Sequence, residues 1–281
     1  MTTARKTQIG LGLTAVVLTV LLFIAPNTPS AKKMAEKQKL ESNEMLVQDL
    51  QSQVQLAVNA LEIKEKTHYD DLLAKAKSTQ SDNAFVDVIA FWDNLKRPDF
   101  AAYFVEQTAN ITQKAEDFHK AGNRYYYAIR FIKDEKEIPI LYQSAVHCYQ
   151  KSIEKDSTNF DAKIQLAACY VEGGKDPMQG IALLKELEKI DSNNVKLQMN
   201  FAFFSVQSQQ WEKAIKRFEK VLAIDPLYIE AYLHLADAYE QQGNIAKTIE
   251  MLEVYASKTD DVMARNEIKK YIEQLKKQTI K

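Results

Sequence analysis

Apolar residues recur at helical spacing in the polar stretch that covers residues 32–80. Steps of three or four positions place them on one face of a helix, because an α-helix completes a turn in about 3.6 residues. The stripe consists of Leu46, Leu50, Val54, Val58 and Leu61. Residues 32–83 are therefore predicted to form a helical stalk that ends in a polar linker. This stalk either packs on the rest of the chain or pairs with a second copy.

The most apolar segment lies at the N-terminus. The run Ile9–Ala25 holds 17 residues without a charge and follows Arg5 and Lys6. At about 1.5 Å per residue it spans about 26 Å, slightly less than the roughly 30 Å hydrocarbon core of a bilayer. The apolar part of a cleaved signal peptide is usually shorter, about 7–15 residues. We therefore expect residues 1–31 to form an uncleaved anchor that crosses the membrane once through residues 9–25.

Basic residues flank this segment on both sides. Two precede it, and four lysines follow it: Lys32, Lys33, Lys37 and Lys39. Counting bases alone would keep the body of the chain in the cytoplasm. A very short charged tail before an apolar segment is, however, the usual arrangement of a signal anchor, and long domains are exported largely regardless of charge. We expect the body to be exported to the periplasmic side.

Composition favours an all-α protein. The chain has 7 glycines and 6 prolines among 281 residues, too few for the many tight turns of a β-sandwich or barrel. Its 37 basic and 38 acidic residues are balanced, which gives no general attraction to nucleic acid.

From residue 144 onward the chain repeats itself. Asp156, Asp191 and Asp225 are spaced by 35 and 34 residues, and the alanines 167, 202 and 236 follow the same period. A sustained period of this length is typical of a solenoid built from stacked helix pairs.

The residues at fixed places in each period identify a family. The last unit carries the pattern most completely, with Tyr232, Leu235, Ala236, Tyr239, Gly243, Thr248 and Leu252. In this pattern the chain resembles the tetratricopeptide repeat family, and its anchor makes it similar to membrane-anchored bacterial members. The resemblance is strong over residues 144–260 and weaker over 84–143, where degenerate helical repeats are expected. Residues 261–281 are predicted to form a capping helix. The expected fold is an all-α tetratricopeptide-repeat solenoid with an N-terminal transmembrane helix.

Sequence motifs give no basis for an enzyme. The two cysteines, Cys148 and Cys169, do not form a CxxC pattern, and we expect buried free thiols, with a disulfide as the alternative for an exported body. The four histidines show no metal-ligand grouping, and no nucleophile or phosphate-binding motif occurs. We therefore predict no catalytic residue, no metal and no cofactor.

The family resemblance implies a concave groove that is lined by the first helix of each unit and binds a peptide. Carried onto this chain, the groove residues are Ile164, Ala168, Lys196, Met199, Phe203, Leu233 and Asp237, flanked by Asp161 and Glu230. Ile164 and Ala168 stand where some members have the Lys and Asn that clamp a peptide carboxylate. The groove is instead expected to be apolar and to suit an amphipathic helix or an extended apolar peptide. The alternative is that Met199 and Phe203 pack on neighbouring helices or on residues 32–80.

Two functions follow as hypotheses. The first is a non-catalytic adaptor, tethered to the membrane, that captures a segment of a partner protein. The resemblance implies roles in secretion, envelope assembly or cytochrome maturation. The second is a structural protein that forms homo-oligomers through its stalk and repeat faces.

Overall fold

The computed structural model describes residues 50–79, 81, 83–174 and 176–279. The predicted anchor at residues 9–25 and the first residue of the stalk stripe, Leu46, lie outside these ranges. Among the helices that are described, none combines the length and the apolar character needed to cross a bilayer.

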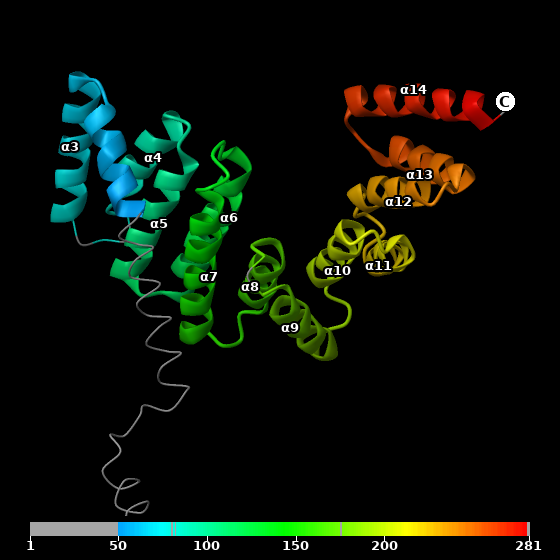
Figure 1. The fold of residues 1–281 in the computed structure, drawn as a ribbon, viewed down its shortest axis with the longest axis horizontal. Helices are drawn as coiled ribbons and strands as arrows, with labels where there is room; N and C mark the ends of the chain where they lie inside the picture. Colours follow the sequence, from blue (N-terminus) through cyan, green and yellow to red (C-terminus); the bar gives the residue numbers. More distant parts are fainter. Residues whose placement is uncertain (1–49, 80, 82, 175, 280–281) are drawn as a thin grey trace, which may run out of the picture. The chain divides into compact units, whose positions relative to one another are not determined.

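All regular structure in the described part is helical. A helical segment over residues 50–60 comes first. The later elements are α3 (Ile63–Ser78), α4 (Val86–Asn94), α5 (Pro98–Thr112), α6 (Ala115–Ala128), the short 3₁₀ helix η1 (Ile129–Phe131), α7 (Ile138–Lys155), α8 (Phe160–Glu172), α9 (Pro177–Ile190), α10 (Val195–Gln207), α11 (Trp211–Ile224), α12 (Glu230–Gln241), α13 (Ile245–Lys258) and α14 (Val262–Thr279). Figure 1 shows these helices following one another in chain order.

The helices pack in consecutive pairs. α6 packs on α7, α8 on α9, α10 on α11 and α12 on α13, while α14 packs on α13. Each pair also contacts the next one along the chain. This is the nearest-neighbour arrangement of a solenoid, in which every pair buries its apolar face against its neighbours.

The repeated aspartates end the second helix of each pair. Asp156, Asp191 and Asp225 are the C-cap residues of α7, α9 and α11, and each side chain accepts a hydrogen bond of 2.9 Å from the backbone N–H two residues later. In the first two turns an asparagine then begins the next helix. Asn159 and Asn194 accept backbone N–H bonds of 2.9 and 3.1 Å from the first turns of α8 and α10. The 34- to 35-residue period thus reflects a turn that recurs between helices. In each turn, side chains accept hydrogen bonds from backbone N–H groups next to the helix ends.

Small residues let the paired helices approach closely. Ala167, Ala202 and Ala236 are at most 2% exposed, and Phe218 packs in the same apolar cluster as Ala202. These positions are buried as the repeat pattern predicted.

The N-terminal helices pack on the body of the chain. Tyr69 of α3 contacts Trp92 of α4 and Phe104 of α5, with ring centroids 5.5 and 6.4 Å apart. Leu50 and Val58, on the stripe predicted for the stalk, are buried in the described structure. The described part of this stripe is therefore buried within the chain and does not form an exposed apolar face.

A buried carboxyl lies between α5, α6 and α7. Glu106 is 2% exposed and accepts a hydrogen bond of 2.6 Å from the hydroxyl of Tyr125. Cys148 also bonds to it, and the Nε2 atom of His147 lies 3.9 Å from its Oε1 atom. Burial raises the pKa of Glu106 above its ordinary value of 4.5, and the two hydrogen bonds oppose this only in part.

This raised pKa predicts a pH-dependent stability. The folded state holds the Glu106 proton more tightly than the unfolded state does. The stability that this proton contributes to the fold is therefore fully present below pH 4.5 and is lost as the pH rises through the raised pKa. Glu106→Gln keeps the hydrogen-bond acceptor but cannot ionise. Chemical denaturation at a series of pH values should show a smaller decline in stability above pH 4.5 for this variant than for the native chain. Equal slopes for the two proteins would contradict the prediction.

Candidate functional site

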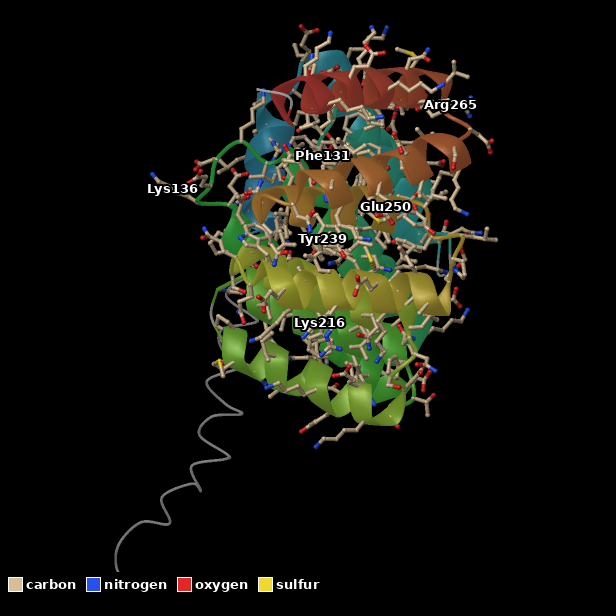
Figure 2. All side chains as sticks on the ribbon, turned by 90° about the vertical axis from the view of Figure 1, so that its right-hand side faces the viewer. Phe131, Lys136, Lys216, Tyr239, Glu250 and Arg265 are labelled. Carbon is tan, nitrogen blue, oxygen red and sulfur yellow. The ribbon has the colours of Figure 1, made fainter. Side chains whose placement is uncertain are left out.

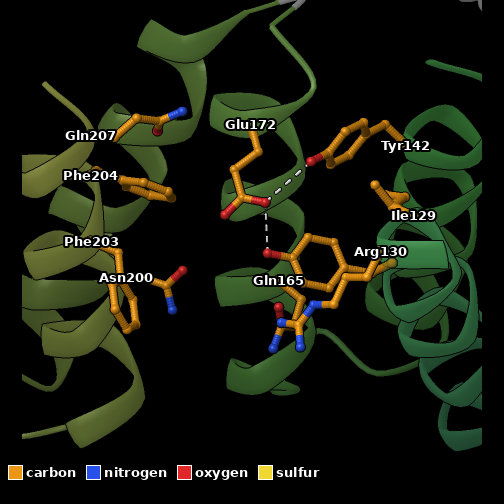
Figure 3. Close-up of a pocket in the computed structure, with 10 residues that line it drawn as sticks. Ile129, Arg130, Tyr142, Gln165, Glu172, Asn200, Phe203, Phe204 and Gln207 are labelled. Atoms are coloured by element: carbon orange, nitrogen blue, oxygen red, sulfur yellow. Dashed lines mark hydrogen bonds between the residues drawn. The ribbon is translucent and has the colours of Figure 1, made fainter. Parts of the chain in front are cut away.

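A pocket of about 510 Å³ lies where the first helices of three successive pairs face one another. In Figure 3 the residues of α10 lie on one side of the pocket, those of η1 and α7 on the other, and those of α8 between them. The lining residues are Tyr126, Ile129, Arg130, Tyr142, Gln165, Glu172, Asn200, Phe203, Phe204 and Gln207. A pocket of this size accommodates a few side chains of a peptide.

The polar centre of the pocket is Glu172, at the end of α8. Its Oε2 atom accepts hydrogen bonds of 2.7 Å from the hydroxyl of Tyr126 and 3.3 Å from that of Tyr142 (Figure 3). Burial, and then the negative charge of Glu172, raises the pKa of both tyrosines. Both tyrosines therefore remain protonated donors, which holds the carboxylate in one position.

Arg130 supplies a positive charge on the opposite side of the pocket. It belongs to η1, is exposed, and makes no hydrogen bond or ion pair with another described residue. Asn200 uses its amide nitrogen to donate a bond of 2.9 Å to the backbone carbonyl of Lys196, so its amide oxygen can accept a bond from a ligand. Gln165 adds a second amide from α8. The pocket thus offers a cation, donors and acceptors together.

Phe203 is the exposed apolar residue of the pocket. Its side chain is 40% exposed, although it lies within a short aromatic stack. Its ring centroid is 4.9 Å from that of His234 and 5.9 Å from that of Phe218. Burial lowers the pKa of His234, so this imidazole is neutral near pH 7 and adds an uncharged ring to the stack.

Among the residues predicted for the groove, Phe203 lines this pocket and the others lie elsewhere. Ile164 and Ala168 are 1% exposed and Met199 is 5% exposed, all within apolar clusters of the core. Lys196 forms an ion pair with Asp161, which bridges α8 and α10 at the surface. Two further predicted residues are on α12, where Leu233 packs toward α13 and α14 and Asp237 is exposed.

The rotation of α8 and α10 about their axes explains this distribution. The pocket is lined by Gln165 and Asn200, each one residue beyond the predicted Ile164 and Met199. One residue along a helix turns the side-chain direction by about 100°. A signal for the pocket residues is present in the sequence, because Gln165 and Asn200 are spaced by 35 residues, as are Glu172 and Gln207. These are polar residues that recur with the repeat period and lie on a single face of each helix.

Both cysteines are free and buried. Burial raises the pKa of the Cys148 thiol and of the Cys169 thiol, so neither is a reactive thiolate near neutral pH. The expectation of buried free thiols is confirmed, and the alternative of a disulfide between them is not what the structure contains.

Comparisons with known proteins agree on the repeat type. A model of the TPR repeat matches residues 206–243, and one of the tetratricopeptide repeat matches residues 230–258. A search of curated proteins gave no match to this sequence. Residues 206–258 therefore carry tetratricopeptide repeats.

One solved structure shares the fold, and others resemble the chain less closely. A tetratricopeptide repeat protein from Parabacteroides merdae is 11% identical, with a TM-score of 0.53, and the match covers 84% of this chain and 87% of that one. A thermophilic TPR protein of Thermus thermophilus is 15% identical, with a TM-score of 0.48 and coverage of 68% and 98%. YrrB, a TPR protein with an unusual peptide-binding site, is 19% identical, with a TM-score of 0.42 and coverage of 70% and 96%. The Parabacteroides structure extends the likeness of fold well beyond residues 206–258.

Proposed function

We propose that this tetratricopeptide-repeat chain is a non-catalytic adaptor that binds an extended segment of a partner protein in the pocket between α6, α8 and α10. The observation that carries the proposal is that one pocket is lined by the exposed Phe203, by Arg130, which has no ion pair within the described residues, and by the amides of Gln165 and Asn200. Repeats of this type are typical of protein-interaction scaffolds.

The chemistry of the pocket favours a peptide over a small apolar molecule. Side-chain amides can donate to the carbonyls and accept from the N–H groups of an extended backbone. Arg130 suits a carboxylate or a backbone carbonyl, and Phe203 suits an apolar side chain. Because Ile164 and Met199 are buried, we propose mixed polar and apolar recognition in place of a continuous apolar strip.

We further propose that residues 9–25 tether the adaptor to a membrane, with the repeat-bearing body on the exported side. The support is the uncharged run Ile9–Ala25 and the short basic tail before it. A tether confines the pocket near partners at the same membrane, so weak contacts are sufficient for capture. Such an arrangement suits secretion, envelope assembly or cytochrome maturation.

Site-specific photocrosslinking of the full chain in its native membrane tests this function. A photoreactive amino acid replaces Asn200 in the pocket, and in a matched protein it replaces Leu227, which is 79% exposed and lies outside the pocket. We expect a partner adduct from position 200 and none from position 227. Adding Phe203→Glu should reduce the adduct at least about tenfold, because it places a charge where an apolar side chain binds.

Three outcomes would count against parts of the proposal. An undiminished adduct with Phe203→Glu would remove the pocket assignment. Adducts consisting of nothing but copies of this chain would favour the structural, self-associating protein. Retention of the chain in the membrane after deletion of residues 1–31 would remove the tether.

A further inference from the structure

A second and larger hollow lies on another side of α10. Its volume is about 740 Å³, and it is formed by α9, the C-terminal half of α10 and the first turns of α11, with Val171 from α8. Phe204 and Gln207 line both this hollow and the pocket described above, so the two sites are separated by the C-terminal half of α10. We call this second site the α9–α11 cleft.

The floor of the α9–α11 cleft is apolar. Phe201 and Phe204 of α10 are each 8% exposed and contribute ring surface, and Ile181 and Val171 are half-buried beside them. Contact between α10 and the preceding pair is sparse compared with the contact inside each pair. The cleft is therefore a gap between neighbouring repeats with hydrophobic side chains at its base.

The walls of the cleft carry only positive charge. Lys185 projects from α9, and Lys213, Lys216 and Arg217 come from α11, whereas no Asp or Glu is among the described residues that line the cleft. Figure 2 labels Lys216 among the side chains of α11. Lys185 and Lys216 are exposed and have no hydrogen bond or ion pair within the described residues, while Lys213 donates only to the neutral amide of Gln210.

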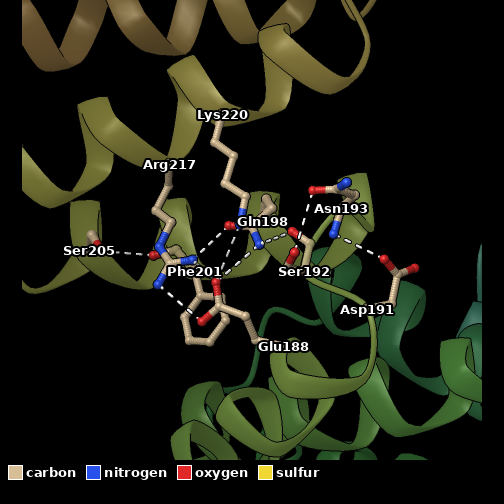
Figure 4. Close-up of polar contacts among 9 residues, drawn as sticks. All are labelled: Glu188, Asp191, Ser192, Asn193, Gln198, Phe201, Ser205, Arg217 and Lys220. Atoms are coloured by element: carbon tan, nitrogen blue, oxygen red, sulfur yellow. Dashed lines mark hydrogen bonds and ion pairs between the residues drawn. The ribbon is translucent and has the colours of Figure 1, made fainter.

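Arg217 differs from the three lysines because its charge is already paired with a carboxylate of this chain. It forms an ion pair with Glu188 and donates a bond of 2.7 Å to Gln198, while its guanidinium carbon lies 4.3 Å from the ring centre of Phe201 (Figure 4). Lys220 approaches the same carboxylate, 3.7 Å away. This network fixes one end of the cleft as a rigid edge, and it leaves the lysines as the charges that a ligand can neutralise.

From this arrangement we infer that the α9–α11 cleft binds an acidic peptide segment with a large apolar side chain. The apolar side chain packs on Phe204 and on the part of Phe201 that Arg217 leaves uncovered, and flanking carboxylates pair with Lys185 on one wall and Lys216 on the other. The occupant is assigned by charge complementarity, because lysines line the cleft from both α9 and α11 and an acidic chain between them is attracted to both. The site opens on another side of α10 from the pocket between α6, α8 and α10, and the two share only Phe204 and Gln207 among their lining residues.

Fluorescence anisotropy with defined peptides tests the inference on the full chain. The probe is a pool of labelled octapeptides in which Phe, Tyr, Trp, Leu or Met is surrounded by Asp and Glu. A matched neutral pool replaces every Asp and Glu by Asn and Gln. We expect the acidic pool to bind at least about tenfold more tightly, with an affinity that falls as salt is added.

Charge reversal on both walls locates the site. Lys185→Glu combined with Lys216→Glu should weaken binding of the acidic pool at least about tenfold. Lys269→Glu combined with Lys270→Glu makes the same change of net charge on exposed positions of α14 and should leave binding unchanged. The milder pair Lys185→Gln and Lys216→Gln should give an intermediate loss, and circular dichroism verifies that each variant keeps its helices. Phe203→Glu, which tests the other pocket, should not alter this binding.

Four results would overturn the inference. Three concern the peptides: no binding of the acidic pool at millimolar concentration, equal binding of the neutral pool, or an equal loss of binding in the α14 control variant. The fourth is that the acidic pool does not bind but the chain binds vesicles of phosphatidylserine and phosphatidylcholine, and that Lys185→Glu with Lys216→Glu abolishes this vesicle binding. The last result would assign these lysines to a membrane surface.

Discussion

Replacing Phe218 by alanine is expected to lower the free energy of unfolding by about 3–5 kcal/mol. The ring of Phe218 is 0% exposed and belongs to the apolar cluster that joins α10, α11 and α12. It also stacks on His234 at a centroid distance of 5.3 Å. Removing it deletes the contacts of an aromatic ring and leaves a cavity that the backbones of three helices cannot easily close.

Urea denaturation followed by circular dichroism measures this loss. Leu227→Ala is the matched control, because Leu227 is a large apolar residue that is 79% exposed, and its replacement should change stability by no more than about 0.5 kcal/mol. A loss of less than about 1 kcal/mol for Phe218→Ala would mean that the cluster repacks around the space, and would contradict a close-packed junction.

The effect of Phe218→Ala should also be localised along the chain. In the described part of the chain each helix pair makes its main contacts with its neighbours, so a weakened junction affects the pairs that meet there more than distant pairs. Hydrogen exchange should show faster exchange in α10–α13 than in the native chain, and little change in α5 and α6. Uniform acceleration along the whole chain would instead indicate that the described part unfolds as one cooperative unit.

Much of this fold could be predicted because its determinants are local. The turn that ends α7 depends on Asp156 and Asn159, three residues apart, and the same pair recurs at Asp191 and Asn194. Such short-range hydrogen bonds are visible in the sequence as a period, and they determine where helices end. The repeat pattern and the small buried residues followed from this local information.

The candidate site was less accessible to sequence reasoning because it depends on helix rotation and on distant pairs. Whether Ile164 or Gln165 faces the pocket depends on how α8 rotates when its buried alanines meet α9. The directions of these two side chains differ by about 100° around the helix axis. The bond between Tyr126 and Glu172 joins residues 46 positions apart. The cleft between α9 and α11 likewise arises from the gap between two repeats, which the pattern within one repeat does not specify.

Replacing Gly180 by alanine is expected to destabilise the junction of α8 and α9 by about 1–3 kcal/mol. A Cβ atom at position 180 would lie 2.5 Å from the backbone carbonyl oxygen of Ala167 and 2.7 Å from a methyl group of Val171. The carbonyl belongs to α8 and can move only if the helix moves. Alanine is intrinsically more favourable than glycine inside a helix by about 1 kcal/mol. A higher free energy of unfolding for Gly180→Ala would therefore mean that helix propensity dominates, and a lower one would mean that close packing dominates.

Comparison with Met178→Ala separates these two effects, because Met178 lies on the same turn of α9 but is 74% exposed. Denaturant unfolding should show Met178→Ala near the native stability and Gly180→Ala clearly below it. Gly180→Ser, which adds one further atom at the same contact, should be less stable than Gly180→Ala. A stabilised Gly180→Ala would mean that α9 shifts away from α8 at little cost. In that case close packing at this glycine would not determine how closely the two helices approach. It would also not fix the wall that α9 provides to the α9–α11 cleft.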